Sequence, residues 1–195
     1  LVGHATTGTL SSAENNTAVG INAMDAITSG DKNTIMGFDA GTALTVGIRQ
    51  TFIGNDAGKT LTGGEGNVFI GDSAGDSANT NASSNTAVGK SALSSIGNKN
   101  YNTALGKDSG VNINAQYNLT LGYDSGDNIT SGDGNVIIGS VDATSATGDR
   151  QLKIAGHDGS TTTTWISGDS SGNVVTEGTV TEYGGASLTT TGKAL

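Results

Sequence analysis

The sequence NVFIGDSAG, from Asn67 to Gly75, recurs in close copies along most of this 195-residue chain. Each copy carries a glycine at its fifth position, which serves as a marker for aligning the copies. The marker glycines are Gly20, Gly37, Gly54, Gly71, Gly89, Gly106, Gly122 and Gly139, so that successive markers differ in number by 17, 17, 17, 18, 17, 16 and 17. A repeat of this length is too short for two helices or a strand–helix–strand crossover. The period of about 17 therefore predicts an all-β, repetitive solenoid or β-roll.

Two aliphatic columns predict two short strands in each coil. The first column directly precedes the marker glycine and contains Val19, Met36, Ile53, Ile70, Val88, Leu105, Leu121 and Ile138. The second follows the marker by seven positions and contains Leu10, Ile27, Leu44, Leu61, Ala78, Ile96, Ile113, Ile129 and Ala146. Uniformly aliphatic columns are typical of core positions, so we expect both to line the coil interior.

The residue two before each marker belongs to the same strand and, by alternation, faces the opposite side. This column is also partly apolar and contains Phe52 and Phe69. With the preceding column inside, a single roll would expose both phenylalanines, and a thin roll has little core of its own. We therefore expect a parallel, intertwined homotrimer in which copies cover each other's apolar stripes.

An amide occupies the position four before each marker. These residues are Asn16, Asn33, Gln50, Asn67, Asn85, Asn102, Asn118 and Asn135. A row of surface amides could bind a ligand. Stacked amides in repeating β-structure, however, hydrogen-bond to each other along the axis, and we favour an internal structural ladder.

Acidic residues recur two positions after the marker, at Asp39, Asp56, Asp108 and Asp124. A stripe of carboxylates suggests calcium, but Asn22, Ser73 and Ser91 interrupt it. Mixed Asp, Asn and Ser are typical of side chains that cap tight turns, so we predict turn capping and no metal or cofactor.

Composition narrows the function classes. Nine basic against 18 acidic residues give a net charge of −9, which disfavours nucleic acid as a partner. No stretch approaches the roughly 18 apolar residues of a membrane span, so we expect no membrane insertion. Only two histidines are present, His4 and His157, and neither accompanies a nucleophile motif. We predict no catalytic residues and no enzymatic activity.

The repeat pattern divides the chain into three parts. We expect the repeat array to span residues 1–156, in nine to ten coils of which the first is truncated, and to form a rod of about 40–45 Å. Residues 157–175 should cap it, and residues 176–195 should form a short β-rich tail that leads to a further C-terminal segment. We favour Trp165 as a plug over the last coil rather than as a sugar-binding platform. It and Tyr183 are nevertheless the best candidates for receptor contact near this end.

The copies NTAVGINA, NTIMGFDAG and NVFIGDSAG resemble the head repeats of trimeric autotransporter adhesins and, more closely, the NxxIGxxAG arrays of bacteriophage tail fibres. The closing WISGDSSGNV, from Trp165 to Val174, is similar to the segment that follows such arrays. The resemblance covers about residues 1–175. It implies a trimeric virion fibre whose shaft supports a tip for host recognition, with partners among the other tail proteins and a host surface receptor of the glycan class.

Two other functions remain open from the sequence. A bacterial cell-surface trimeric adhesin would have similar repeats, although the period here is longer than in those heads and no coiled-coil neck or membrane anchor is visible. A polysaccharide-degrading tailspike would need paired carboxylates in a groove, and no repeat carries the insertion that builds one.

Overall fold

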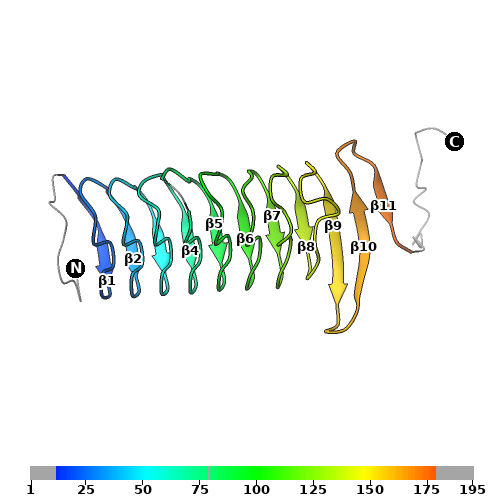
Figure 1. Ribbon diagram of the computed structural model, residues 1–195, viewed down its shortest axis with the longest axis horizontal. Helices are drawn as coiled ribbons and strands as arrows, with labels where there is room; N and C mark the ends of the chain where they lie inside the picture. The colour runs from blue at the N-terminus through cyan, green and yellow to red at the C-terminus, as the bar shows by residue number, and fades with distance from the viewer. Residues whose placement is uncertain (1–11, 79, 179–195) are drawn as a thin grey trace, which may run out of the picture.

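The computed structural model describes residues 12–78 and 80–178. In these ranges the chain is all-β, and it winds into a row of stacked coils (Figure 1). All strands of the described residues belong to one 11-stranded sheet whose spatial order is the order in the chain. The prediction of a β-solenoid with one coil per sequence repeat is confirmed.

Each coil contributes one strand of three residues. The coil strands are β1 (Thr17–Val19), β2 (Thr34–Met36), β3 (Thr51–Ile53), β4 (Val68–Ile70), β5 (Thr86–Val88), β6 (Thr103–Leu105), β7 (Leu119–Leu121) and β8 (Val136–Ile138). Neighbouring strands pair in parallel with equivalent residues in register, so that Phe52 lies between Ile35 and Phe69. The sequence repeat therefore becomes a set of straight columns along the axis.

The marker glycine is required because adjacent coils approach closely at this corner. Gly37 has φ +143°, and a Cβ atom on it would lie 2.1 Å from the carbonyl oxygen of Gly54. Gly54 meets Gly71 in the same way, at 2.3 Å. A side chain at any of these positions would force two coils apart, which explains why the marker is glycine in every copy.

The coil interior is lined by the opposite strand face from the one expected. Phe52 and Phe69 are fully buried within the single chain, and their rings stack with centroids 5.0 Å apart. By contrast, Met36 and Leu105, which directly precede marker glycines, are 45% and 46% exposed. The prediction that the Phe column needs other copies to cover it is therefore wrong, because the residue two before the marker is the one that points inward.

The second aliphatic column lies in the core from Ile27 to Ile129 but forms no regular strand in the described residues. Leu44, Leu61 and Ile113 are fully buried, and the segments around them are turns and bends. Backbone pairing between coils on this side takes the form of isolated bridges, such as that between Ala78 and Gly97. The prediction of two strands per coil is therefore wrong, since turn backbone can supply core side chains without a second ladder. Leu10 of this column lies outside the described residues.

Core volume is balanced between two positions in four of the coils. Where the inward strand residue is phenylalanine, the residue six positions later is glycine: a Cβ on Gly75 would lie 2.5 Å from the ring of Phe69. In the coils of Ala18 and Ala87, that later position is filled by Met24 or Leu93. Both are fully buried and adopt positive φ, 56° and 50°, which is unfavourable for bulky side chains. Filling the core offsets this backbone strain. The coil of Ala104 differs, because its later position is Gly110, beside which Leu93, Ile113 and Thr120 lie.

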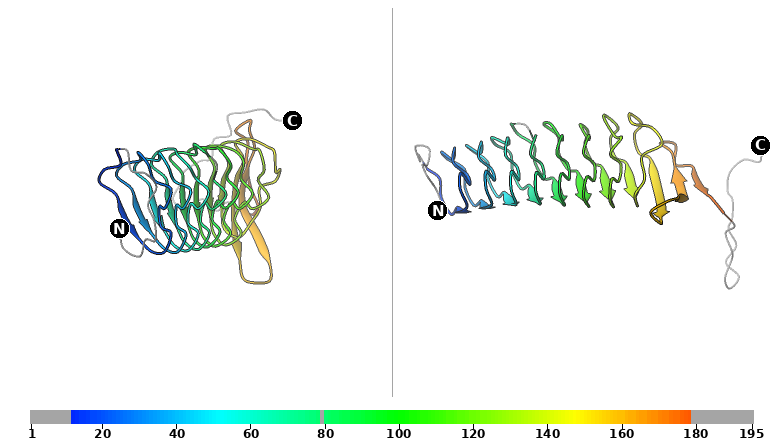
Figure 2. Two further views of the ribbon diagram at one scale, coloured as in Figure 1. Left: turned by 60° about the vertical axis from the view of Figure 1, so that its left-hand side comes forward. Right: turned by 60° about the horizontal axis from the view of Figure 1, so that its bottom comes forward.

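The parallel stack ends in a three-stranded unit. β9 (Leu152–His157) pairs in parallel with β8, whereas β10 (Thr162–Gly168) and β11 (Val174–Thr176) follow as antiparallel strands. The hairpin of β9 and β10 extends beyond the outline of the coils (Figure 2). Most of the predicted tail, including Tyr183, lies outside the described residues. No helix in the described parts is long and apolar enough to span a membrane.

Candidate functional surfaces

A continuous ladder of side-chain amides runs inside the solenoid. Asn85 Oδ1 accepts hydrogen bonds from the backbone N–H of Asn102 (2.9 Å) and from its Nδ2 (3.2 Å). Asn85 Nδ2 in turn donates to Asn67 Oδ1 at 3.0 Å and to the carbonyl of Lys99 at 2.8 Å. Each amide thus ties its coil to the one before and bridges two corners of its own coil. Asn67, Asn85 and Asn102 are fully buried, so the amides serve the coil interior and bind no external ligand.

The same pattern joins all eight predicted amides from Asn16 to Asn135. The ladder also continues one coil further, because Gln151 donates to Asn135 Oδ1 through its backbone N–H at 2.8 Å. Gln151 does not belong to the eight aligned copies. Its position, about one period after Asn135, is the sequence signal that could have included it.

The acidic column lies on a corner of the coils where the backbone is left-handed. Asn22, Asp39, Asp56, Ser73, Ser91, Asp108 and Asp124 all have φ between 49° and 56°. Short polar side chains tolerate this conformation better than others do. The backbone geometry therefore accounts for the mixture of Asp, Asn and Ser in the column.

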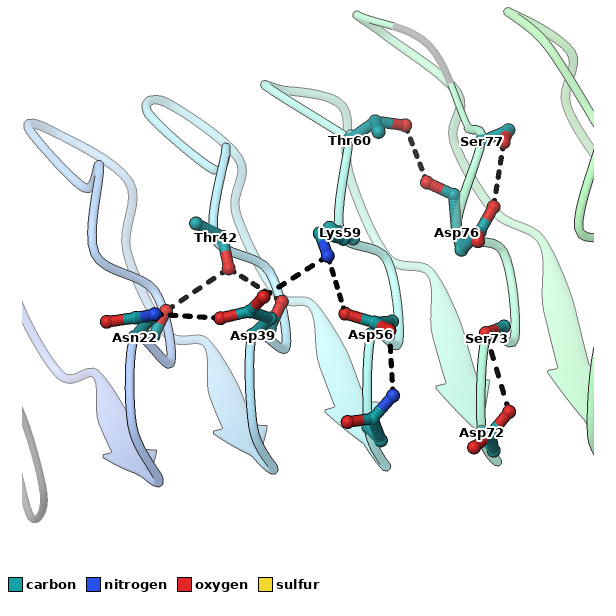
Figure 3. A network of polar contacts seen from close by, with 11 residues as sticks. Asn22, Asp39, Thr42, Asp56, Lys59, Thr60, Asp72, Ser73, Asp76 and Ser77 are labelled. Carbon is teal, nitrogen blue, oxygen red and sulfur yellow. Dashed lines mark hydrogen bonds and ion pairs between the residues drawn. The ribbon is translucent and has the colours of Figure 1, made fainter.

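Ion pairs and amides engage several of these carboxylates (Figure 3). Asp39 accepts from Asn22 Nδ2 at 2.8 Å, and Lys59 Nζ lies 3.1 Å from Asp39 and 2.8 Å from Asp56. The hydrogen bond from Asn22, together with Lys59, lowers the pKa of Asp39. Across residues 12–78 and 80–178, no three carboxylate or histidine side chains are grouped closely enough to hold a metal ion.

One acidic pair lies in a small hollow near β8. Asp124, Asp127 and Asp142 line it together with Ser140 and Val141. Burial and the neighbouring carboxyl group of Asp142 raise the pKa of Asp127 to about 6. Asp127 therefore takes up a proton more readily than an ordinary aspartate, and at neutral pH its carboxylate is repelled by the neighbouring carboxyl group of Asp142.

Trp165, the first predicted receptor contact, lies in β10 and is 55% exposed. It borders an open hollow of about 380 Å³ that is also lined by His157, Asp158 and Thr163. His157 Nδ1 lies 2.9 Å from Thr162 Oγ1, and Asp158 accepts backbone hydrogen bonds from Thr161 and Ser160, which lower its pKa. His157 and Asp158 thus stabilise the β9–β10 turn, and Trp165 presents an open aromatic surface beside it. Tyr183, the second predicted contact, lies outside the described residues.

Other exposed aromatic residues were not singled out from the sequence. Tyr101 and Tyr117 stack at 5.0 Å between ring centroids on a coil corner and are 52% and 60% exposed. Lys107 Nζ lies 5.0 Å from the ring centroid of Tyr123. Tyr101 and Tyr117 each precede an amide of the ladder by one position, which is the sequence signal that places them in one column.

Comparisons with known proteins give no relative: no family model matches the chain, and no curated protein or solved structure matches it.

Proposed function

We propose that the chain is the shaft of a virion tail fibre that takes part in host-cell attachment and acts as a homotrimer. The observation that carries this proposal is the unbroken parallel ladder from β1 to β9, reinforced along its length by the buried amides. Every coil is hydrogen-bonded to its neighbours through both backbone and side chains, so the rod resists bending and local opening. A stiff spacer is what a fibre needs to hold a binding tip away from a particle.

Binding by the shaft itself is weak in this view. Its exposed aromatic residues, such as Trp165 and Tyr117, lie on different elements, and no single cluster in the described residues concentrates them as in a high-affinity interface. Repeated shallow contacts to surface glycans gain strength only through multivalency. In this role the chain spaces and orients a binding tip, and it catalyses no reaction.

The first test is localisation. An antibody raised against the purified chain is applied, with gold labelling, to virus particles and to bacterial cells from the same culture. We expect label on the tail fibres of particles. Label on the cell envelope and none on the particles would indicate a cell-surface adhesin and would overturn the proposal.

The second test concerns binding. Fluorescent chain, with and without Trp165→Ala, is incubated with host cells, and bound fluorescence is measured against competing surface polysaccharide. We expect weak binding that polysaccharide competes away and that Trp165→Ala reduces several-fold. Tight binding that survives Trp165→Ala would place the receptor contact on another surface of the chain.

A further inference from the structure

The sheet of β1–β8 has one face that points away from the coil interior. It is made of the first and third residues of each strand, which we call the outer face: Thr17, Val19, Thr34, Met36, Thr51, Ile53, Val68, Ile70, Thr86, Val88, Thr103, Leu105, Leu119, Leu121, Val136 and Ile138. None of these residues is charged, although the chain carries 9 basic and 18 acidic side chains.

The outer face is open in the single chain. Met36, Ile53, Leu105 and Leu121 are 36–46% exposed, and each is the third residue of its strand. Where both faces of a parallel sheet are covered, its strands carry apolar residues on both faces. The strands β1–β8 show this pattern, since their third residues are aliphatic on the face opposite the coil interior. A continuous apolar row of this length on a free surface marks an interaction site.

The row continues onto the end sheet. Ile138 pairs with Ile154 in β9, and Ile154 pairs with Ile166 in β10, so these side chains extend the third-residue column. Gly156 faces the same side as Ile154 by strand alternation. A Cβ on Gly156 would lie 2.5 Å from the indole ring of Trp165, so the half-exposed tryptophan packs over this end of the row, where it also borders the open hollow.

We infer that the outer face and its continuation on the end sheet are the interface between parallel copies of this chain; the inference rests on the trimeric shaft proposed above. The rows of the outer face repeat at the strand spacing of about 4.8 Å, and only another stack with the same spacing keeps them interlocked along the whole length. A second copy is such a stack.

The face is long and narrow. Ten strand spacings from β1 to β11 and a width of about three residues give on the order of 500 Å² per chain. This is below the roughly 800 Å² per partner of a standard stable interface, so the area places the contact among the smaller interfaces. The lack of charge matters equally, because copies with a net charge of −9 can approach closely only along an uncharged surface.

The exposed side chains of the end sheet favour a parallel orientation of the copies. Val174 and Val175 are 62% and 56% exposed, and β11 has all three residues exposed. In a parallel assembly the end sheets of all copies meet at the same level and cover these side chains. In an antiparallel assembly they lie at opposite ends and stay in water.

The first experiment measures mass in solution at micromolar concentration for the wild type, Leu105→Asp and a control, Val46→Asp. Val46 is 53% exposed but lies on a turn away from the outer face. We expect three chain masses for the wild type and the control, and one chain mass of 19.2 kDa for Leu105→Asp. Circular dichroism should be unchanged, since Leu105 points away from the coil interior.

The results of this mass measurement can contradict the proposed interface without contradicting the proposed shaft function. A trimeric wild type with a trimeric Leu105→Asp would move the interface to another surface and leave the shaft proposal standing. A monomeric wild type would overturn the interface and the trimer together, even where antibody still labels the fibres.

The second experiment tests the orientation and uses the absence of cysteine from the chain. Met36→Cys lies near one end of the outer face, so oxidation should join two copies only where like ends meet. We expect a disulfide-linked pair on a non-reducing gel for Met36→Cys alone. A linked pair that forms only when Met36→Cys is mixed with Leu121→Cys would show an antiparallel arrangement and overturn the parallel one.

Discussion

The coils of β1–β8 and the sheet of β9–β11 bury apolar side chains in different ways. In the coils, strand residues such as Phe52 and Phe69 point into a core that the chain closes around itself. In the end sheet, Val174 and Val175 of β11 remain exposed, and Trp165 packs over Gly156 while staying half in water. The interior of the coils is therefore closed within one chain, whereas the end sheet leaves apolar side chains exposed. Stability of the single chain should come from the coils, and contact with partners should come from the end sheet and the outer face.

The strongest test of this comparison removes one core ring. Phe69→Ala leaves a cavity beside Phe52 and should lower the free energy of unfolding by about 3–5 kcal/mol. Trp165→Ala, the matched change in the end sheet, should cost far less in the monomeric Leu105→Asp background, since the indole is already half in water. Chemical denaturation followed by circular dichroism gives both values. Similar losses would contradict the division between the two regions.

The next largest effect is expected in the amide ladder. Asn85→Ala removes the acceptor of the Asn102 backbone N–H and the donor to the carbonyl of Lys99, and we expect a loss of about 2–3 kcal/mol. Asn112→Ala is the control, because its exposed side chain donates a single bond to the carbonyl of Asp127. Equal effects of the two changes in the same denaturation assay would mean that the ladder adds nothing beyond ordinary surface hydrogen bonds.

A compensating pair tests the volume balance inside the coils. Phe69→Ala with Gly75→Leu reproduces the combination of Ala87 with Leu93 found in the next coil. The added leucine should recover about 1–2 kcal/mol of the loss caused by Phe69→Ala, because it fills the cavity. Recovery should be incomplete, because leucine is strained in the left-handed backbone conformation of position 75. Gly75→Leu alone should destabilise, since its Cβ would lie 2.5 Å from the Phe69 ring. A double-mutant cycle measures the coupling, and additive effects would refute the balance.

The smallest expected effect concerns pH. The folded-state pKa of Asp127 is raised to about 6 from 3.8, so its contribution to stability is fully present below about pH 3.8 and is lost as pH rises through 6. Asp127→Asn removes the repulsion and should stabilise at pH 7 by at most about 1 kcal/mol, because solvent screens the pair. The gain should vanish once the pH falls below the unfolded-state pKa. Thermal melts across this range provide the measurement.

Asp158→Asn serves as the opposite case in the end sheet. Backbone N–H groups lower the pKa of Asp158, so its contribution is present at neutral pH and is lost as pH falls through that lowered value. This substitution should destabilise the hairpin at pH 7. The same sign for both variants at pH 7 would contradict the assigned causes.

Parts of the candidate surfaces follow from single residues of the sequence and parts do not. The internal position of the amides from Asn16 to Asn135 follows from their period and chemistry. Strand alternation then places the residue two after each amide, such as Phe52 and Phe69, on the same inward side, and the residue after that, such as Ile53, outward. The uniformity of the aliphatic column points to the wrong face. An even number of positions from a buried amide is the better sign that a strand residue faces inward. Apolar character alone does not distinguish the faces, since both faces of a parallel strand are apolar when both are covered.

The sequence by itself determined the coil length, the strand in each coil and the corner that only glycine can occupy, because these depend on local spacing and on contacts between equivalent residues one period apart. Only the tertiary structure decided that turn backbone carries Leu44 and Leu61 into the core without a second strand, and that Met24 and Leu93 adopt left-handed conformations. These features depend on how much space the neighbouring coils leave. That space is a property of the whole stack, since each core side chain packs against residues about one period away on either side.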